Sequence, residues 1–204
     1  WSSDVCSSDL LTASKATATT APTHVLSTLT AANATSINVT NGDAKLTVGS
    51  LAGSTALVLL DGSAATQDTS VTTGAVAFAA TGGTAFKLGA GNDTLVLTGA
   101  TSASTGTDFV ITGGAGGDAV TLTATGATQL EKLVYTAATD SQVGVNKFDS
   151  ITNFVTTEDK IDLKAFNFSG ASVAALLDRT GKTIGTNGEV AAADQSNWFN
   201  DGTK

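Results

Sequence analysis

The stretch Gly113-Gly114-Ala115-Gly116-Gly117-Asp118-Ala119-Val120-Thr121 decides the fold prediction for this chain. It follows a nine-residue pattern in which paired glycines and an aspartate precede a short apolar strand. Because glycine adopts positive φ without strain, a tight turn of this kind can direct successive carbonyl oxygens inward. Asp118 adds a carboxylate where the turn ends. A hard cation such as Ca²⁺ prefers oxygen ligands of this kind, so the stretch predicts a calcium-binding turn.

A second copy, Leu88-Gly89-Ala90-Gly91-Asn92-Asp93-Thr94-Leu95-Val96, lies 25 residues upstream and lacks only the first glycine. The spacing exceeds two nine-residue repeats, so residues 98–107 are expected to form a longer turn on the opposite side of the coil. Asp93 would then stack on Asp118, and a cation between them would replace repulsion by attraction. The alternative is that both are ordinary turns of a glycine-rich protein, but two copies in compatible register favour calcium.

Short β-prone segments separated by Gly, Asp, Asn, Ser and Thr recur along the chain, most with alternating apolar residues. Their spacing suits a sandwich or a solenoid, but three-residue strands between glycine-rich turns favour the solenoid. The predicted fold is all-β: a parallel β-solenoid of the β-roll kind, capped by a small C-terminal region with one short helix at Ala171–Leu177. The predicted strands are Ile37–Val39, Leu46–Val48, Leu57–Leu60, Val76–Phe78, Phe86–Leu88, Leu95–Leu97, Phe109–Ile111, Val120–Leu122 and Leu133–Tyr135.

The segment from Asp149 to Leu163 joins two short apolar strands through an acidic turn. We expect Ile151 and Phe154, with Ile161 and Leu163, to close the open end of the solenoid, because an exposed last coil leaves unpaired strand edges.

The glycine-aspartate turns and this closing segment resemble the repeats-in-toxin (RTX) proteins and the related S-layer proteins that bacteria export by type I secretion. The resemblance implies a β-roll that binds Ca²⁺ between successive turns, and it covers residues 86–168 best. It also implies an additional cation site at Asp159 and Asp162, with Asp149 a weaker candidate, although turn formation explains these acids equally well. The predicted metal-binding residues are Gly89, Gly91, Asn92, Asp93, Gly114, Gly116, Asp118, Asp159 and Asp162.

Composition excludes several classes of protein. The formal net charge is −8, with 18 acidic and 10 basic side chains, so the clustered cations that nucleic acids require are missing. A single cysteine forms no internal disulfide. No apolar run reaches the length of a membrane span.

The chain divides into four segments on sequence grounds. Residues 1–10 resemble a translated adapter sequence rather than native protein, and 11–35 are an Ala/Thr-rich linker or a first coil. Residues 36–140 form the predicted solenoid with its two calcium-type turns, and 141–204 form the cap, which ends abruptly after Trp198 and Phe199.

Catalytic constellations are missing from the sequence. His24 is the only histidine, which leaves no pair of zinc-binding histidines, and no Gly-x-Ser-x-Gly elbow occurs. We therefore expect a non-enzymatic, calcium-stabilised structural module of a secreted or cell-surface bacterial protein, of the S-layer or adhesin type. Its partners would be calcium ions and, in such an array, identical subunits or a cell-surface polysaccharide. The alternative is the C-terminal secretion and folding domain of a larger exported enzyme, such as a metalloprotease or lipase. A weaker third hypothesis is a carbohydrate-binding or adhesive sandwich without metal.

Overall fold

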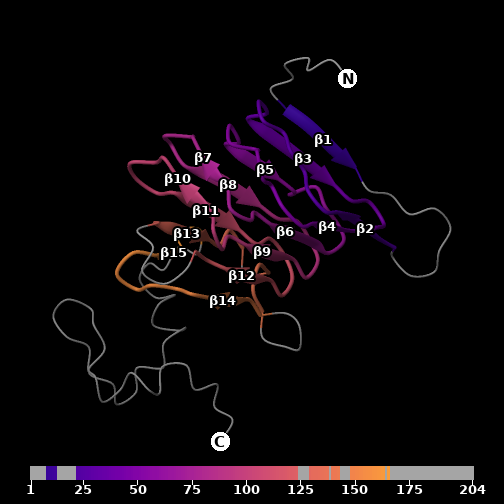
Figure 1. Ribbon diagram of the computed structural model, residues 1–204. Helices are drawn as coiled ribbons and strands as arrows, with labels where there is room; N and C mark the ends of the chain where they lie inside the picture. The colour runs from indigo at the N-terminus through magenta and orange to yellow at the C-terminus, as the bar shows by residue number, and fades with distance from the viewer. Residues whose placement is uncertain are drawn as a thin grey trace, which may run out of the picture. The chain divides into compact units, whose positions relative to one another are not determined.

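The computed structural model describes residues 8–12, 22–123, 129–137, 139–142, 148–163 and 165. Residues 1–166 form one compact unit and residues 167–204 a second, and all the described residues belong to the first. In this unit the chain winds into a parallel β-solenoid of about five turns (Figure 1). The predicted fold class is confirmed. The predicted helix at 171–177 lies outside the described residues.

Two parallel sheets enclose the core, and each turn of the solenoid contributes one strand to each of them. The first sheet, in spatial order, contains β1 (Ser8–Thr12), β3 (Ser36–Thr40), β5 (Leu59–Asp61), β8 (Thr84–Lys87), β11 (Phe109–Thr112), β13 (Glu131–Val134) and β15 (Lys160–Asp162). The second contains β14 (Ser150–Thr152), β12 (Ala119–Thr121), β9 (Thr94–Val96), β6 (Thr69–Thr72), β4 (Lys45–Val48) and β2 (Thr23–Leu26). A small third sheet pairs β10 (Thr101–Ser102) with β7 (Ala77–Phe78).

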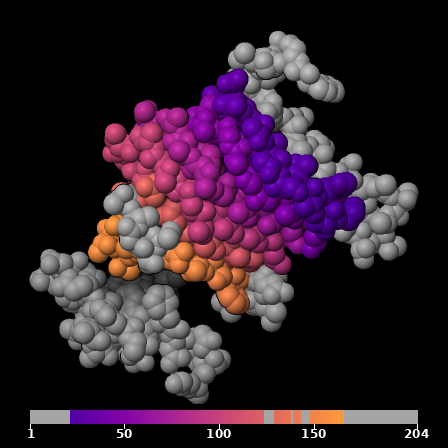
Figure 2. All heavy atoms as spheres, in the orientation of Figure 1, coloured from indigo at the N-terminus to yellow at the C-terminus, as the bar shows by residue number. Residues whose placement is uncertain are grey.

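Identical positions of successive turns pair directly, so the sequence is stacked coil upon coil. In the space-filling view the colours follow one another along this stack in chain order (Figure 2). Inward-facing apolar residues form continuous files through the core, because alternate residues of a strand share one face. The file of the first sheet is Ile37, Leu60, Phe86, Ile111 and Leu133, and that of the second is Val48, Val71, Leu95 and Val120; all nine are buried.

Three phenylalanines, Phe78, Phe86 and Phe109, fill the middle of the core, and each is almost completely buried. Phe78 packs edge-on against Phe86 and Phe109, with ring centroids 6.0 Å apart in both pairs. Phe86 and Phe109 stack in neighbouring turns at 6.2 Å. Edge-to-face contacts at this distance stabilise a core beyond the area that they bury.

The two glycine-aspartate turns have the same length. They join β8 to β9 and β11 to β12 and occupy residues 88–93 and 113–118. The other connections from the first sheet to the second range from residues 41–44 to residues 135–149, and the return connections vary as well. The longer turn expected at residues 98–107 lies in the return connection between β9 and β11 and contains β10. Equal length is therefore a property of the two glycine-aspartate turns and not of a whole side of the coil.

Each of the nine predicted strand segments overlaps a strand of the structure. The sequence did not reveal β6, whose residues Thr69-Ser70-Val71-Thr72 include a single large apolar side chain, nor the two-residue β10. It also left open whether residues 11–35 form a coil; Thr23–Leu26 does form β2, which pairs with β4. Ser8, Asp9 and Leu10 pair with β3, while the proposed origin of residues 1–10 stays a prediction.

The closing segment only partly covers the end of the core. Ile151 and Phe154 pack against the core cluster, as expected. Ile161 and Leu163 are themselves 49% and 39% exposed, so the last layer of the core faces solvent. Ile161 extends the inward file beyond Leu133, and among the described residues no strand pairs with the far edge of β15. None of the helices in the described part of the chain has the length and apolarity to cross a membrane.

Candidate metal site

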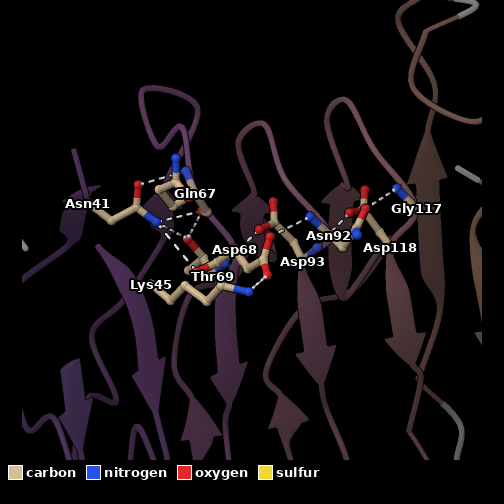
Figure 3. Close-up of polar contacts among 9 residues, drawn as sticks. All are labelled: Asn41, Lys45, Gln67, Asp68, Thr69, Asn92, Asp93, Gly117 and Asp118. Carbon is tan, nitrogen blue, oxygen red and sulfur yellow. Dashed lines mark hydrogen bonds and ion pairs between the residues drawn. The ribbon is translucent and has the colours of Figure 1, made fainter. Parts of the chain in front are cut away.

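The glycine-aspartate turns of neighbouring coils lie directly on one another. Thr94 pairs with Ala119, so the preceding residues Asp93 and Asp118 occupy equivalent positions in adjacent turns. The backbone N–H of Asp93 donates a hydrogen bond of 2.9 Å to Asp118 Oδ1 (Figure 3). The structure thus brings together the two carboxylates that the sequence singled out.

These two residues belong to a longer file, here called the inner carboxylate row: Asp93, Asp118 and Asp149. Each accepts a hydrogen bond from a backbone N–H of the preceding turn. Asp93 Oδ1 accepts from Thr69 at 2.7 Å, and Asp149 Oδ1 accepts from Asp118 at 2.9 Å. Sequence analysis ranked Asp149 last among the candidates, because the long connection after Tyr135 concealed its register with Asp118.

A second file, the outer row of Asp68 and Asn92, lies beside the inner carboxylate row. Its side-chain oxygens accept hydrogen bonds from N–H groups of the following turn, whereas those of the inner row accept from the preceding turn. Asp68 Oδ1 accepts from the N–H of Asn92, and Asn92 Oδ1 accepts from the N–H of Gly117, both at 3.0 Å (Figure 3). Asp68 is not among the residues predicted to bind metal, and its carboxylate also forms an ion pair with Lys45. The side chain of Asn92 is therefore engaged in joining two turns.

Only glycine fits where the turns nest. A Cβ on Gly114 would lie 1.9 Å from the carbonyl oxygen of Gly89, and a Cβ on Gly116 would lie 1.7 Å from that of Gly91. Gly114 and Gly116 also adopt φ of 94° and 139°, which side-chain-bearing residues rarely adopt. The carbonyl groups of Gly89 and Gly91 thus face the next turn.

The inner carboxylate row is electrostatically strained. Asp118 is only 2% exposed, and its Oδ2 is buried without a hydrogen-bond partner. Burial raises the pKa of Asp118 to about 7, and the nearby carboxylates of Asp93, Asp149 and Asp140 contribute to the increase. Burial likewise raises the pKa of Asp93 to about 6, although Asp93 Oδ2 accepts a hydrogen bond from Gly89 at 3.0 Å. A buried acceptor without a partner costs free energy, and a bound cation would remove that cost.

Asp159 and Asp162 lie apart from this row, at the strand β15 of the first sheet. Asp159 accepts hydrogen bonds from the N–H groups of Glu131 and Val155, at 3.2 and 2.7 Å. Asp162 forms an ion pair with Lys132 at 3.1 Å. These contacts give both residues a role in holding the last turns together, and their predicted metal binding stays a prediction.

Side chains alone do not form a metal cage. In the described ranges no three His, Cys, Asp or Glu residues are grouped so that they could hold an ion. A cation between the glycine-aspartate turns would therefore need backbone carbonyl oxygens beside the carboxylates. Such a mixed set of oxygens is one that Ca²⁺ accepts.

Asp108, Glu131 and Asp140 are also buried acids, and none of them was among the predicted site residues. Glu131 accepts hydrogen bonds from the N–H and hydroxyl of Thr123, and burial, together with its hydrogen bond to Asp159, raises its pKa to about 7. Asp140 is buried, and its Oδ2 accepts hydrogen bonds from the N–H and hydroxyl of Thr136 and from the N–H of Ala137. No local motif marks these positions, since their burial arises from the stacking of turns.

The family model described as Peptidase M10 serralysin C terminal matches residues 53–195, well over half of the chain. The chain belongs to the serralysin C-terminal family. No curated protein and no solved structure matches it. The predicted resemblance to RTX-type proteins is thereby confirmed, and both glycine-aspartate turns lie within the matched residues. The serralysin C-terminal domain is a non-catalytic module of secreted proteins, in agreement with a β-solenoid that has no enzymatic constellation in its sequence.

Proposed function

We propose that this chain is a calcium-binding β-roll module of a secreted bacterial protein, and that Ca²⁺ bound at the glycine-aspartate turns stabilises the stacked coils. The observation that carries the proposal is the buried Asp118 Oδ2, which has no protein partner and lies in a row of carboxylates. A hard divalent cation satisfies such an oxygen and screens the repulsion along the row.

The residues proposed to hold the ion are those of the two nested turns. Asp93 and Asp118 supply carboxylate oxygens, and Gly89, Gly91, Gly114 and Gly116 supply backbone carbonyls. Asn92 supports the site through its hydrogen bond to Gly117. When bound, Ca²⁺ supplies positive charge and additional coordination between turns. The protein's part is to align the turns in register, which the backbone hydrogen bond from Ala115 to Gly89 does at 3.0 Å.

The role of the module in its parent protein has two candidate forms. Membership of the serralysin C-terminal family favours a role as the C-terminal folding and secretion domain of a larger exported enzyme. The Ala- and Thr-rich coils before the calcium turns favour a structural module of an S-layer or adhesin. In both forms the module works outside the cell or at its surface, and export through a C-terminal type I signal is part of the proposal.

Calcium titration of the purified chain tests the binding. Ca²⁺ should raise the melting temperature and the β content measured by circular dichroism, because a ligand that binds only the folded state stabilises it. At a calcium concentration about 100 times the dissociation constant, the gain is about 2.7 kcal/mol. Mg²⁺ serves as the control ion, since it demands a tighter octahedral site. A chain that melts at the same temperature in calcium and in chelator would refute the proposal.

A further inference from the structure

The turns that join the first sheet to the second change character along the solenoid. Register places Leu46 and Thr69 in the file that continues as Asp93, Asp118 and Asp149. The early turns therefore carry an apolar and a hydroxyl side chain where the later turns carry carboxylates. The same structural position is built in two chemically different ways.

A single amide occupies the early turn. Asn41 is fully buried, and its Oδ1 accepts from the N–H groups of Thr66 and Gln67 at 3.0 and 3.1 Å. Its Nδ2 donates to the hydroxyl of Thr69 at 3.1 Å and to the carbonyl oxygen of Gln67 (Figure 3). Asn41 thus joins two turns with both ends of its side chain, and it brings no charge.

Lys45 precedes the outer row in the stack of turns. Its ammonium group forms an ion pair with Asp68, the carboxylate of the outer row. Burial alone would raise the pKa of Asp68, but the hydrogen bonds from Lys45 and from the N–H of Asn92 outweigh it, and the pKa lies below its ordinary value. Asp68 is therefore neutralised by the protein itself, whereas burial raises the pKa of Asp93 and Asp118.

Charge divides along the same boundary. Residues 22–87 contain three acidic and two lysine side chains, a formal net charge of −1. Residues 88–163 contain nine acidic and three lysine side chains, a formal net charge of −6. Self-repulsion of this size opposes a compact state unless counter-ions reduce it.

From these contrasts we infer that the solenoid has a metal-independent half, residues 22–87, on which a calcium-dependent half, residues 88–163, assembles. The first half satisfies its turns with Asn41 and Lys45, so it keeps its structure without an ion. The second half relies on an ion at its turns, so it opens first when calcium is removed. Each turn contacts only its neighbours, so a stable first half offers the second a strand edge with which its first strands can pair. The inference rests on the proposed calcium binding.

Hydrogen exchange of the full chain, measured by mass spectrometry in calcium and in chelator, tests the division. Chelation should speed exchange of the amides of β9, β12 and β14 by about tenfold or more, and leave β3, β4 and β5 within about twofold. Equal acceleration in both halves would overturn the inference and leave calcium binding standing. No acceleration anywhere would refute calcium binding itself, and the inference with it.

Two variants test the residues assigned to the first half. Asn41→Ala leaves buried donors and acceptors unpaired, so exchange of β4 and β5 should rise about tenfold or more in calcium and in chelator alike. Lys45→Gln, the milder change, should speed exchange of the turn 62–68 in both conditions, with Lys87→Gln on the first sheet as its matched control. If these effects vanish on adding calcium, or if neither variant alters β4, β5 or the turn, the first half is not held in the way inferred.

Discussion

Replacing Asp118 by Asn should have opposite effects with and without calcium. Asn keeps the shape of the side chain and an oxygen that can accept from the N–H of Asp93. It removes the buried charge, which in the absence of an ion is unfavourable. It also removes a proposed calcium ligand. Asp118→Asn should therefore be more stable than the natural chain in chelator and less stable in calcium.

The structure sets the size of the first effect. The pKa of Asp118 is raised from 3.8 to about 7. At 1.36 kcal/mol per pKa unit, ionisation at about pH 7.5 costs the folded state about 4 kcal/mol at most. Relaxation of the turn reduces that bound, so we expect a gain of about 1–3 kcal/mol in chelator. In saturating calcium the variant should lose most of the stabilisation that the ion gives the natural chain.

Thermal and urea unfolding, followed by circular dichroism in millimolar calcium and in chelator, measure the change in stability under both conditions. Asp43→Asn is the matched control, because Asp43 is an exposed acid in the equivalent turn of an early coil. Its stability should respond to calcium as the natural chain does. An Asp118→Asn chain that is less stable than the natural one in both conditions would refute the account of a buried charge awaiting an ion.

Three further predictions concern pH, the glycine turns and the core. In chelator, the free energy of unfolding should fall as pH rises from about 4 to about 7. The reason is that the raised pKa values of Asp93 and Asp118 let the folded state bind more protons than the unfolded state. Thermal melts at several pH values check this, and a free energy of unfolding that rises over that range would contradict it. Gly116→Ala should lower the free energy of unfolding by about 2 kcal/mol or more through strain and collision with Gly91, whereas Gly106→Ala, where a Cβ meets nothing within 4 Å, should change it little. Phe86→Ala should cost about 3–5 kcal/mol in calcium, since its ring fills the fully buried centre of the core; a loss below about 1 kcal/mol in urea melts would argue against the stacked aromatic core.

The sequence was sufficient to predict the solenoid and the stacking of Asp93 on Asp118. Both depend on local signals: glycine pairs, an aspartate and an alternating strand, repeated at a spacing that returns the chain to the same edge. The same signals predicted the strands around Phe86, Leu95, Phe109 and Val120. The fold was therefore predictable where a local pattern repeats at a regular spacing.

Features that depend on long-range register were not predictable in this way. β6 has too few apolar residues to stand out, and its identity comes from pairing with β4 and β9. Asp149 joins the inner carboxylate row only after a connection between β13 and β14 that is longer than the turns 88–93 and 113–118. Ile161 continues the inward file beyond Leu133, but the exposure of Ile161 and Leu163 was not predictable, because an apolar pattern indicates an inward-facing position and not whether anything covers it.

The equal length of the two glycine-aspartate turns has an evolutionary consequence. Connections elsewhere in the coil differ in length, and even the long one between β13 and β14 returns Asp149 to its place beside Asp118. A change of length within residues 88–93 or 113–118 would instead separate the glycines and the carboxylate that meet where these two turns nest. Diversity among relatives should therefore accumulate outside the two turns, where new surface features can be acquired without altering how one rung is joined to the next.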